Sequence, residues 1–584
     1  MGLSDGFANP VANREFRVLN GIREIAQELA GDTPFSPGRT RQSALGEIAV
    51  ILNNKNQPPF AALLSEPPPG ELEYGSDVVG LVVMSFSVFA ILHMASEDPR
   101  NSVMEPSVRA LWPHTIKWAA ALHPARGRLT FASDAERDRG RTVIVSSVVQ
   151  VYLNLSDAEP KHIKPFLHAN PDVLAQAFEL WLRFHDHISP SDKSASQWAH
   201  SLTLAVGKLY ELLIDGDDNV AAASDRVLFV DELRGAIDGD PRVLQRAIHL
   251  QTKFLRGITI SKAMRAKVWK EHFRLLLRLV CLTELWPKKI SRNAITSVVS
   301  TGLYCMREDM QDSAYSAVRL VAGLCCLTGS NRPLVQAVSE GVFDLVQKLE
   351  ESPDSREYDL SDFVRHICAG FSQPRLIRTF RRLYPYPPST AGRPPRRKPT
   401  WVDVFEVYDK YNDLYTISKN QRGWRRAMQC TNTMGPHDQM VRICTCGMAY
   451  YCSGSCQRMH WHEHREECLE NNGPWDLNGE ISISDVVFTG DIVSWYISDH
   501  KDEIGHQLSK LNLLPKYRGG QPKQAVLHVD LTDLIPPLPT HQINIQAKPA
   551  SVPGVVMVEV CLRLGNLRAT RWMPFIMPLF YFGL

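Results

Sequence analysis

Residues 430–468 read CTNTMGPHDQMVRICTCGMAYYCSGSCQRMHWHEHREEC and hold six of the twelve cysteines of this 584-residue chain. Cysteine thiolate and neutral imidazole are ligands that suit Zn(II), which prefers four of them in a tetrahedron. The candidate ligands form three close pairs and one single residue: Cys444 with Cys446, Cys452 with Cys456, His464 with Cys468, and Cys430. Two of the pairs have a spacing of four, so one helical turn can present both members. The stretch predicts a small module that depends on metal for folding.

The stretch resembles the MYND zinc finger most closely from Tyr451 onward, where Tyr-Cys-Ser precedes Cys456-Gln457, Trp461, His464 and Cys468. The resemblance implies a cross-brace with two zinc ions, in which alternate ligand pairs share one metal. One ion would take the second and fourth pairs, and the other ion the first and third. The implied ligand sets are Cys444, Cys446, His464 and Cys468 for one site, and Cys430, Cys452, Cys456 and one further residue for the other.

The sequence departs from the MYND pattern in two places. Cys444-Thr-Cys446 leaves one residue between the ligands where the family has two, which tightens the turn. The partner of Cys430 is missing as well, and His437 is the nearest substitute. The alternative is that His437 is a surface-loop histidine and that water completes a site with three protein ligands. One zinc site is therefore predicted outright, and the other is conditional on an eighth ligand.

The burial expected for the other side chains of the module follows from the sequence around them. We expect Trp461 to pack the small core, together with Tyr450 and Tyr451, because a unit of this size has little apolar area. We expect His460 and His462 to be exposed, outside the metal shell. The nearby glutamates Glu463, Glu466 and Glu467 lie in a charged stretch that is typical of solvated surface. No HExxH motif is present, so a structural zinc is favoured over a catalytic one.

Upstream of the module, residues 12–383 form a succession of amphipathic helical patterns with short Gly, Pro, Asp and Ser breaks. This predicts a mainly α region, either an α-solenoid or a helical bundle. The stretch LVQAVSEGVFDLVQKLEE, 334–351, resembles an armadillo-type junction, with a short helix ending at Gly341. HANPDVLAQAFELWL, from His168, is a weaker example. The alternative is a set of ordinary amphipathic helices with a glycine break.

Residues 78–96, VVGLVVMSFSVFAILHMAS, contain no formally charged side chain and have about the length that crosses a bilayer. A fully buried helix of a large helical domain is also apolar all round. The core helix is favoured, because no basic cluster flanks the run and His93 and three serines interrupt it.

The sequence between and after these regions predicts three further segments. Residues 384–400 are a basic, proline-rich linker, and residues 401–429 are a helical lead-in to the finger. Residues 469–584 are expected to form a small α/β region, with strands at AVLHVDLTDL and GVVMVEVCLRL. Its helix is expected to begin at Ser484 as N-cap, and the final WMPFIMPLFYFGL to pack in the core.

The composition restricts the function further. Lys+Arg number 65 and Asp+Glu 63, so no global field attracts nucleic acid or an anionic membrane. The start, MGLSDGFANP, lacks a secretory pattern, and the scattered remaining cysteines are typical of a reducing compartment. We therefore expect a cytoplasmic or nuclear protein.

By resemblance, a MYND finger on a helical scaffold implies a protein–protein interaction scaffold or adaptor rather than an enzyme. Its partners would be other proteins, including proline-containing peptides, and no small-molecule substrate is expected. The first alternative is a protein lysine methyltransferase, since some of these enzymes carry a MYND finger. Against it, the stretch after Cys468 shows neither an Asn-His-Ser-Cys type sequence nor a Gly-rich cofactor loop. The second alternative is a transcription-associated, nucleic-acid-binding regulator.

Overall fold

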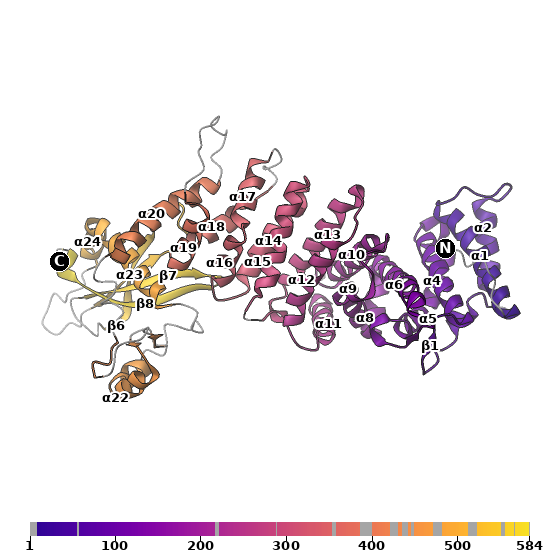
Figure 1. Ribbon diagram of the computed structural model, residues 1–584, viewed down its shortest axis with the longest axis horizontal. Coiled ribbons are helices and arrows are strands. Elements are labelled where there is room, and N and C mark those ends of the chain that lie inside the picture. Colours follow the sequence, from indigo (N-terminus) through magenta and orange to yellow (C-terminus); the bar gives the residue numbers. More distant parts are fainter. Residues whose placement is uncertain are drawn as a thin grey trace. The chain divides into compact units, whose positions relative to one another are not determined.

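The structure is a computed structural model, and it describes residues 9–54, 58–215, 221–287, 289–352, 358–385, 400–420, 430–434, 442–444, 449–470, 482–511, 523–549, 555–565 and 567–582 (Figure 1). The chain forms two compact units, residues 1–287 and 288–584. The mainly α fold class is confirmed, as is a small α/β region near the C-terminus. The division between the units falls inside the predicted helical region 12–383.

The first unit is built almost entirely from helices. They are α1 Pro10–Ala30, α2 Arg41–Leu52, α3 Ala61–Leu64, α4 Asp77–Ser96, α5 Glu105–Ala121, α6 Asp134–Asp157, α7 Pro160–Ala169, α8 Asp172–Leu182, α9 Phe184–His187, α10 Ala195–Leu213, α11 Ala221–Ala236, α12 Arg242–Gly257 and α13 Lys262–Val280. The short strands β1 Leu72–Glu73 and β2 Leu129–Thr130 pair in parallel. Contacts run from α1 to α4, then to α6, α10 and α13, so these helices stack in a row.

The apolar stretch 78–96 forms α4, which the side chain of Ser76 caps by accepting from the amide of Val79. In the described part of the chain, α4 is the one helix long and apolar enough to cross a membrane, and 67% of its most apolar window is buried. It packs against α1, α5 and α6. This burial agrees with the predicted core helix, although one side of α4 is left uncovered.

Several histidines are buried in the neutral form. Burial lowers the pKa of His272 to about 3, and its Nε2 lies 3.0 Å from the hydroxyl of Thr252. Burial likewise lowers the pKa of His366 to about 3 and that of His123 to about 4. Because the unfolded chain binds protons at these sites below about pH 6.5 and the folded chain does not, acid favours unfolding.

We therefore expect stability to be highest above pH 6.5 and to fall as the pH is lowered towards 3. At pH 5 each such histidine is expected to cost about 2 kcal/mol relative to pH 7. Calorimetric unfolding at both pH values checks this, with His272→Gln as a variant whose transition should shift less with pH. An identical pH dependence in the wild type and this variant would contradict the assignment of His272.

The second unit continues with helices and adds two small sheets. The helices are α14 Arg292–Arg307, α15 Gln311–Cys326, α16 Arg332–Ser339, α17 Val342–Glu351, α18 Ser361–Gly370, α19 Pro374–Leu383, α20 Thr400–Asn420, α22 Gly454–Glu470, α23 Ile483–Asp499 and α24 Lys501–Ser509. Gly341, with φ +92°, separates α16 from α17, as the break expected there requires. Linker residues 386–399 and lead-in residues 421–429 lie outside the described residues.

The larger sheet has the strand order β6-β5-β7-β8. Its strands are β5 Lys523–Asp530, β6 Thr540–Pro549, β7 Val555–Leu564 and β8 Leu567–Pro578. The predicted strands correspond to β5 and β7, which pair in parallel. The expectation for the C-terminal stretch was incomplete, because WMPFIMP belongs to edge strand β8, where proline is tolerated. The predicted N-cap was also wrong, since Ser482 caps α23 in a capping box with Asp485.

Asn331 joins the helical part of the second unit to the turn between β7 and β8. Its Nδ2 donates to the carbonyl of Arg563 at 3.0 Å, and its Oδ1 accepts from the amide of Gly565 at 2.8 Å. The Nε2 of His366 lies 3.4 Å from the same oxygen. A buried side chain thus satisfies two backbone groups of the hairpin, which fixes the sheet against the α15–α16 connection.

Candidate metal centre

The finger is assembled from a short hairpin and one helix. β3 Arg442–Ile443 pairs antiparallel with β4 Tyr450–Tyr451, and the amide of Cys444 donates to the carbonyl of Ala449 at 2.8 Å. The helix α22 begins at Gly454, just after Cys452. Cys444 therefore follows β3 directly and Cys452 follows β4, whereas α22 supplies Cys456, His464 and Cys468 and the chain ahead of the hairpin supplies Cys430.

Two groups of three ligands come together within the described part of the finger. Their members are Cys430, Cys452 and Cys456 in one, and Cys444, His464 and Cys468 in the other. Within each group all ligand atoms lie within 4.8 Å of one another. These two groups reproduce the interleaved ligand pairs that the resemblance to the MYND finger implies. Cys446 and His437 lie outside the described residues, so their assignment as ligands stays a prediction.

The sulfur separations suit a tetrahedral zinc site. Zn–S bonds of about 2.3 Å place two tetrahedral ligands about 3.8 Å apart. The sulfurs of Cys444 and Cys468 are 3.9 Å apart, and those of Cys452 and Cys456 are 3.3 Å apart. Three of these thiols are almost fully buried, as is His464 at 1% exposure. Each group fits a zinc ion, and the donor chemistry is that of a structural site.

In the group of Cys430, Cys452 and Cys456, the surroundings favour the thiolate of two members and disfavour that of Cys452. The amide of Cys452 donates to the sulfur of Cys430 at 3.4 Å. A hydrogen bond with the Ser453 side chain holds the pKa of the Cys456 thiol below its ordinary value, while burial and bonding to Cys456 raise that of Cys452 to about 11. A divalent cation favours the ionised form of both thiols, so metal binding here is coupled to proton release.

Two expectations about α22 were wrong. His460 is not exposed, because its side chain is only 15% accessible and its Nδ1 lies 2.9 Å from the Tyr451 hydroxyl. The ring of His460 also stacks on that of His464, with the ring centroids 6.1 Å apart. Trp461 does not fill the core but is 39% exposed. The expected burial of Tyr451 is confirmed, whereas the side chain of Tyr450 lies outside the described residues.

The sequence carried a signal for His460 that the ligand pairs alone did not use. Cys456, His460, His464 and Cys468 recur every four residues, which places all of them on one face of α22. His460 therefore lies on the ligand-bearing face and joins the helix to β4 through Tyr451. Trp461 is one residue further around the helix and faces solvent. His462 is 75% exposed, as expected.

Comparison with known proteins agrees with this centre. A stretch of 54 residues is 35% identical to histone-lysine N-methyltransferase SMYD3 of Mus musculus, and it covers 9% of this chain and 12% of that protein. No solved structure matches the chain significantly. Residues 428–468 match the MYND finger family. The chain therefore carries a MYND finger at residues 428–468 within a mostly helical protein.

Proposed function

We propose that this chain is a zinc-binding protein–protein interaction scaffold or adaptor of the cytoplasm or nucleus, without enzymatic activity of its own. The observation that carries the proposal is the MYND finger with its two Cys/His groups, since such fingers bind protein partners. Proline-containing peptides are the proposed ligands of the finger. The zinc ions hold its shape and leave the recognition to its surface.

The surface of the finger supports a role in binding. Trp461 and Met459 project from α22 with 39% and 51% of their area exposed, and Met434 is 84% exposed. Large apolar side chains are enriched at protein interfaces, and tryptophan is the residue type most often found to dominate binding energy. A small zinc module gains nothing in stability from exposing them, so they are the proposed contact residues.

We expect Trp461→Ala to weaken finger-dependent partner binding by about tenfold or more while both zinc groups stay filled. Quantitative co-purification of partners with the full-length chain, together with zinc analysis, measures both effects. Cys281→Ser is the matched control, because Cys281 is an exposed free cysteine outside the finger. Retention of every partner by Trp461→Ala would remove this surface from the proposal, and retention by a zinc-ligand variant would remove the finger altogether.

The helical region is proposed as a second binding surface. The support for an armadillo-like character is local: α16 ends at Ser339, Gly341 adopts a left-handed conformation, and α17 begins with Val342. Stacked helices in such repeats expose long surfaces to partners.

A lysine methyltransferase is the second candidate, favoured by the identity to SMYD3 over 54 residues. The two candidates differ in their need for S-adenosylmethionine. Titration calorimetry of the full-length chain with this cofactor is expected to show no heat of binding. Saturable binding of one equivalent would instead support the enzyme.

A further inference from the structure

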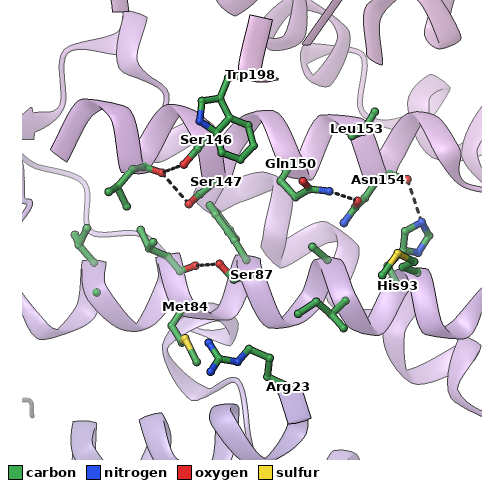
Figure 2. A pocket seen from close by; sticks show the side chains of 18 of the residues that line it. Arg23, Met84, Ser87, His93, Ser146, Ser147, Gln150, Leu153, Asn154 and Trp198 are labelled. Atoms are coloured by element: carbon green, nitrogen blue, oxygen red, sulfur yellow. Dashed lines mark hydrogen bonds between the residues drawn. The ribbon is translucent and has the colours of Figure 1, made fainter. Parts of the chain in front are cut away.

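A long trough lies between α4 and α6 in the first unit, with a volume of about 1340 Å³ (Figure 2). Arg23 of α1 borders it on one side and Trp198 of α10 on the other. Sites for small ligands typically enclose about 300–1,000 Å³, so this trough is larger than a single small molecule requires. It follows α4 over nearly its whole length, which for 20 residues is about 30 Å.

The two walls run in the same direction. At one end a Cβ on Gly75 would lie 3.6 Å from a carboxylate oxygen of Glu136. At the other end, the Nε2 of His93 lies 3.0 Å from the carbonyl oxygen of Asn154. Both helices therefore begin at one end of the trough and end at the other.

The wall formed by α4 has the spacing of a helix-packing seam. Among the α4 residues that line the trough, one row alternates steps of three and four: Gly80, Val83, Ser87, Ala90 and Met94. That pattern is the a and d repeat with which one helix packs along another. Ser87 is exposed and Met94 is 49% exposed, so no described segment covers the centre of this seam.

The wall formed by α6 is mostly polar. One row of its lining residues is again three and four apart, and two members of this row are apolar: Arg139, Val143, Ser146, Gln150 and Leu153. The side-chain amide of Gln150 donates to the Oδ1 of Asn154 at 2.8 Å, along the α6 wall (Figure 2). The trough thus has a mainly apolar wall on α4 and a mainly polar wall on α6, and an occupant that matches both walls is amphipathic.

The charge distribution gives the trough a direction. Glu97 and Asp157 lie where α4 and α6 end, and Lys208 pairs with Asp157. Burial raises the pKa of Glu97, and so do the carboxylates of Asp157, Glu159 and Glu105. The negative ends of two helix dipoles add to this acidic potential. A helix laid antiparallel would place its positive N-terminus at this end.

We propose that the trough receives an amphipathic α-helix from a partner protein, about five turns long and antiparallel to α4 and α6. Its apolar face packs on the seam of α4, its polar edge faces α6, and a basic first turn lies against Glu97 and Asp157. The proposal rests on the scaffold function and assigns it a second site that does not involve the finger.

The test uses the full-length chain and a fluorescein-labelled synthetic 20-residue amphipathic helix with leucine and alanine on one face and two lysines in its first turn. We expect saturable binding by fluorescence anisotropy, and hydrogen-exchange protection confined to residues 76–97 and 136–157. Moving the lysines to the last turn should weaken binding several-fold, because Glu97 then meets no cation of the peptide and Asp157 keeps only its pair with Lys208.

Two variants fill the trough from opposite walls, Ser87→Trp on α4 and Gln150→Trp on α6. Each is expected to weaken peptide binding by about tenfold or more. Val78→Trp is the matched control, because Val78 lies on the same helix, is 44% exposed and does not line the trough. Absence of binding, or equal binding by Ser87→Trp and Val78→Trp, would overturn the proposal.

Three other occupants of the trough would each give a different experimental result, and any of these results contradicts the proposal of a partner helix. If a second copy of the chain occupies the trough, we expect self-association that Ser87→Trp abolishes. If a segment of the same chain occupies it, we expect an intramolecular cross-link at Ser87. A membrane would show as flotation with phosphatidylcholine and phosphatidylserine vesicles. Trp461→Ala should leave peptide binding unchanged, so failure of the trough and failure of the finger are separable.

Discussion

Cys456→Ser is expected to lower the zinc content of the full-length chain from two ions to one, and Cys456→Ser combined with His464→Ala to lower it almost to zero. The reason is the separation of the ligands into two groups, with Cys456 in one and His464 in the other. Structural zinc contributes about 10–16 kcal/mol to small modules of this kind, which exceeds any packing term available to the finger. Elemental analysis after gel filtration measures the content directly.

The control for this experiment is Cys281→Ser, which removes an exposed thiol outside the finger and should leave two ions bound. The variants also separate the two sites. If the wild type holds one ion and Cys456→Ser still holds one, the group of Cys430, Cys452 and Cys456 does not bind zinc, and His437 is not its fourth ligand. Loss of both ions from Cys456→Ser alone would mean that the groups fold as one unit.

The metal centre was the part of the structure most open to prediction from sequence. Ligand spacing is local, so pairs such as His464 and Cys468 determine their own geometry on α22. The predicted exposure of His460 and the predicted burial of Trp461 were wrong because neither residue is a metal ligand, and the direction of its side chain depends on the register of the whole helix. Their places follow from the repeat of four residues that begins at Cys456.

The helical part of the structure was less open to prediction from sequence than the metal centre. The composition of α4 predicted a buried helix, and most of its residues are buried. What composition does not contain is the identity of the neighbours: the trough exists because α6, which begins 38 residues after α4 ends, supplies Ser146, Ser147 and Gln150 to the lining that α4 shares. Likewise, nothing near Asn331 in the sequence indicates that it binds Gly565, which is 234 residues away. Such pairings are tertiary, and a single sequence does not encode them in a readable spacing.

Gly565→Ala is expected to release the β7–β8 hairpin from the helices of the second unit. Gly565 has φ +59°, a conformation that costs an L-residue about 1–2 kcal/mol. A Cβ there would also lie 1.8 Å from the carbonyl oxygen of Thr328 and 3.0 Å from that of Cys325. Neither atom can rotate away, since both belong to the backbone. We therefore expect a total loss of about 3–5 kcal/mol.

The measurement is hydrogen exchange of the full-length chain, because a local opening free energy is well defined even when two units unfold separately. Gly127→Ala is the matched control: its φ is +65°, but nothing lies within 4 Å of the added Cβ, so it should cost only the conformational term. Asn331→Ala should accelerate exchange in the same strands by a second route, because it leaves the buried amide of Gly565 and the carbonyl of Arg563 without their partner. Faster exchange in β7 for both variants, with slow exchange retained in α4, would show that the sheet is held by this one junction. If Gly565→Ala and Gly127→Ala lower the local opening free energy equally, the close approach of Gly565 to Thr328 does not hold the hairpin against the helices.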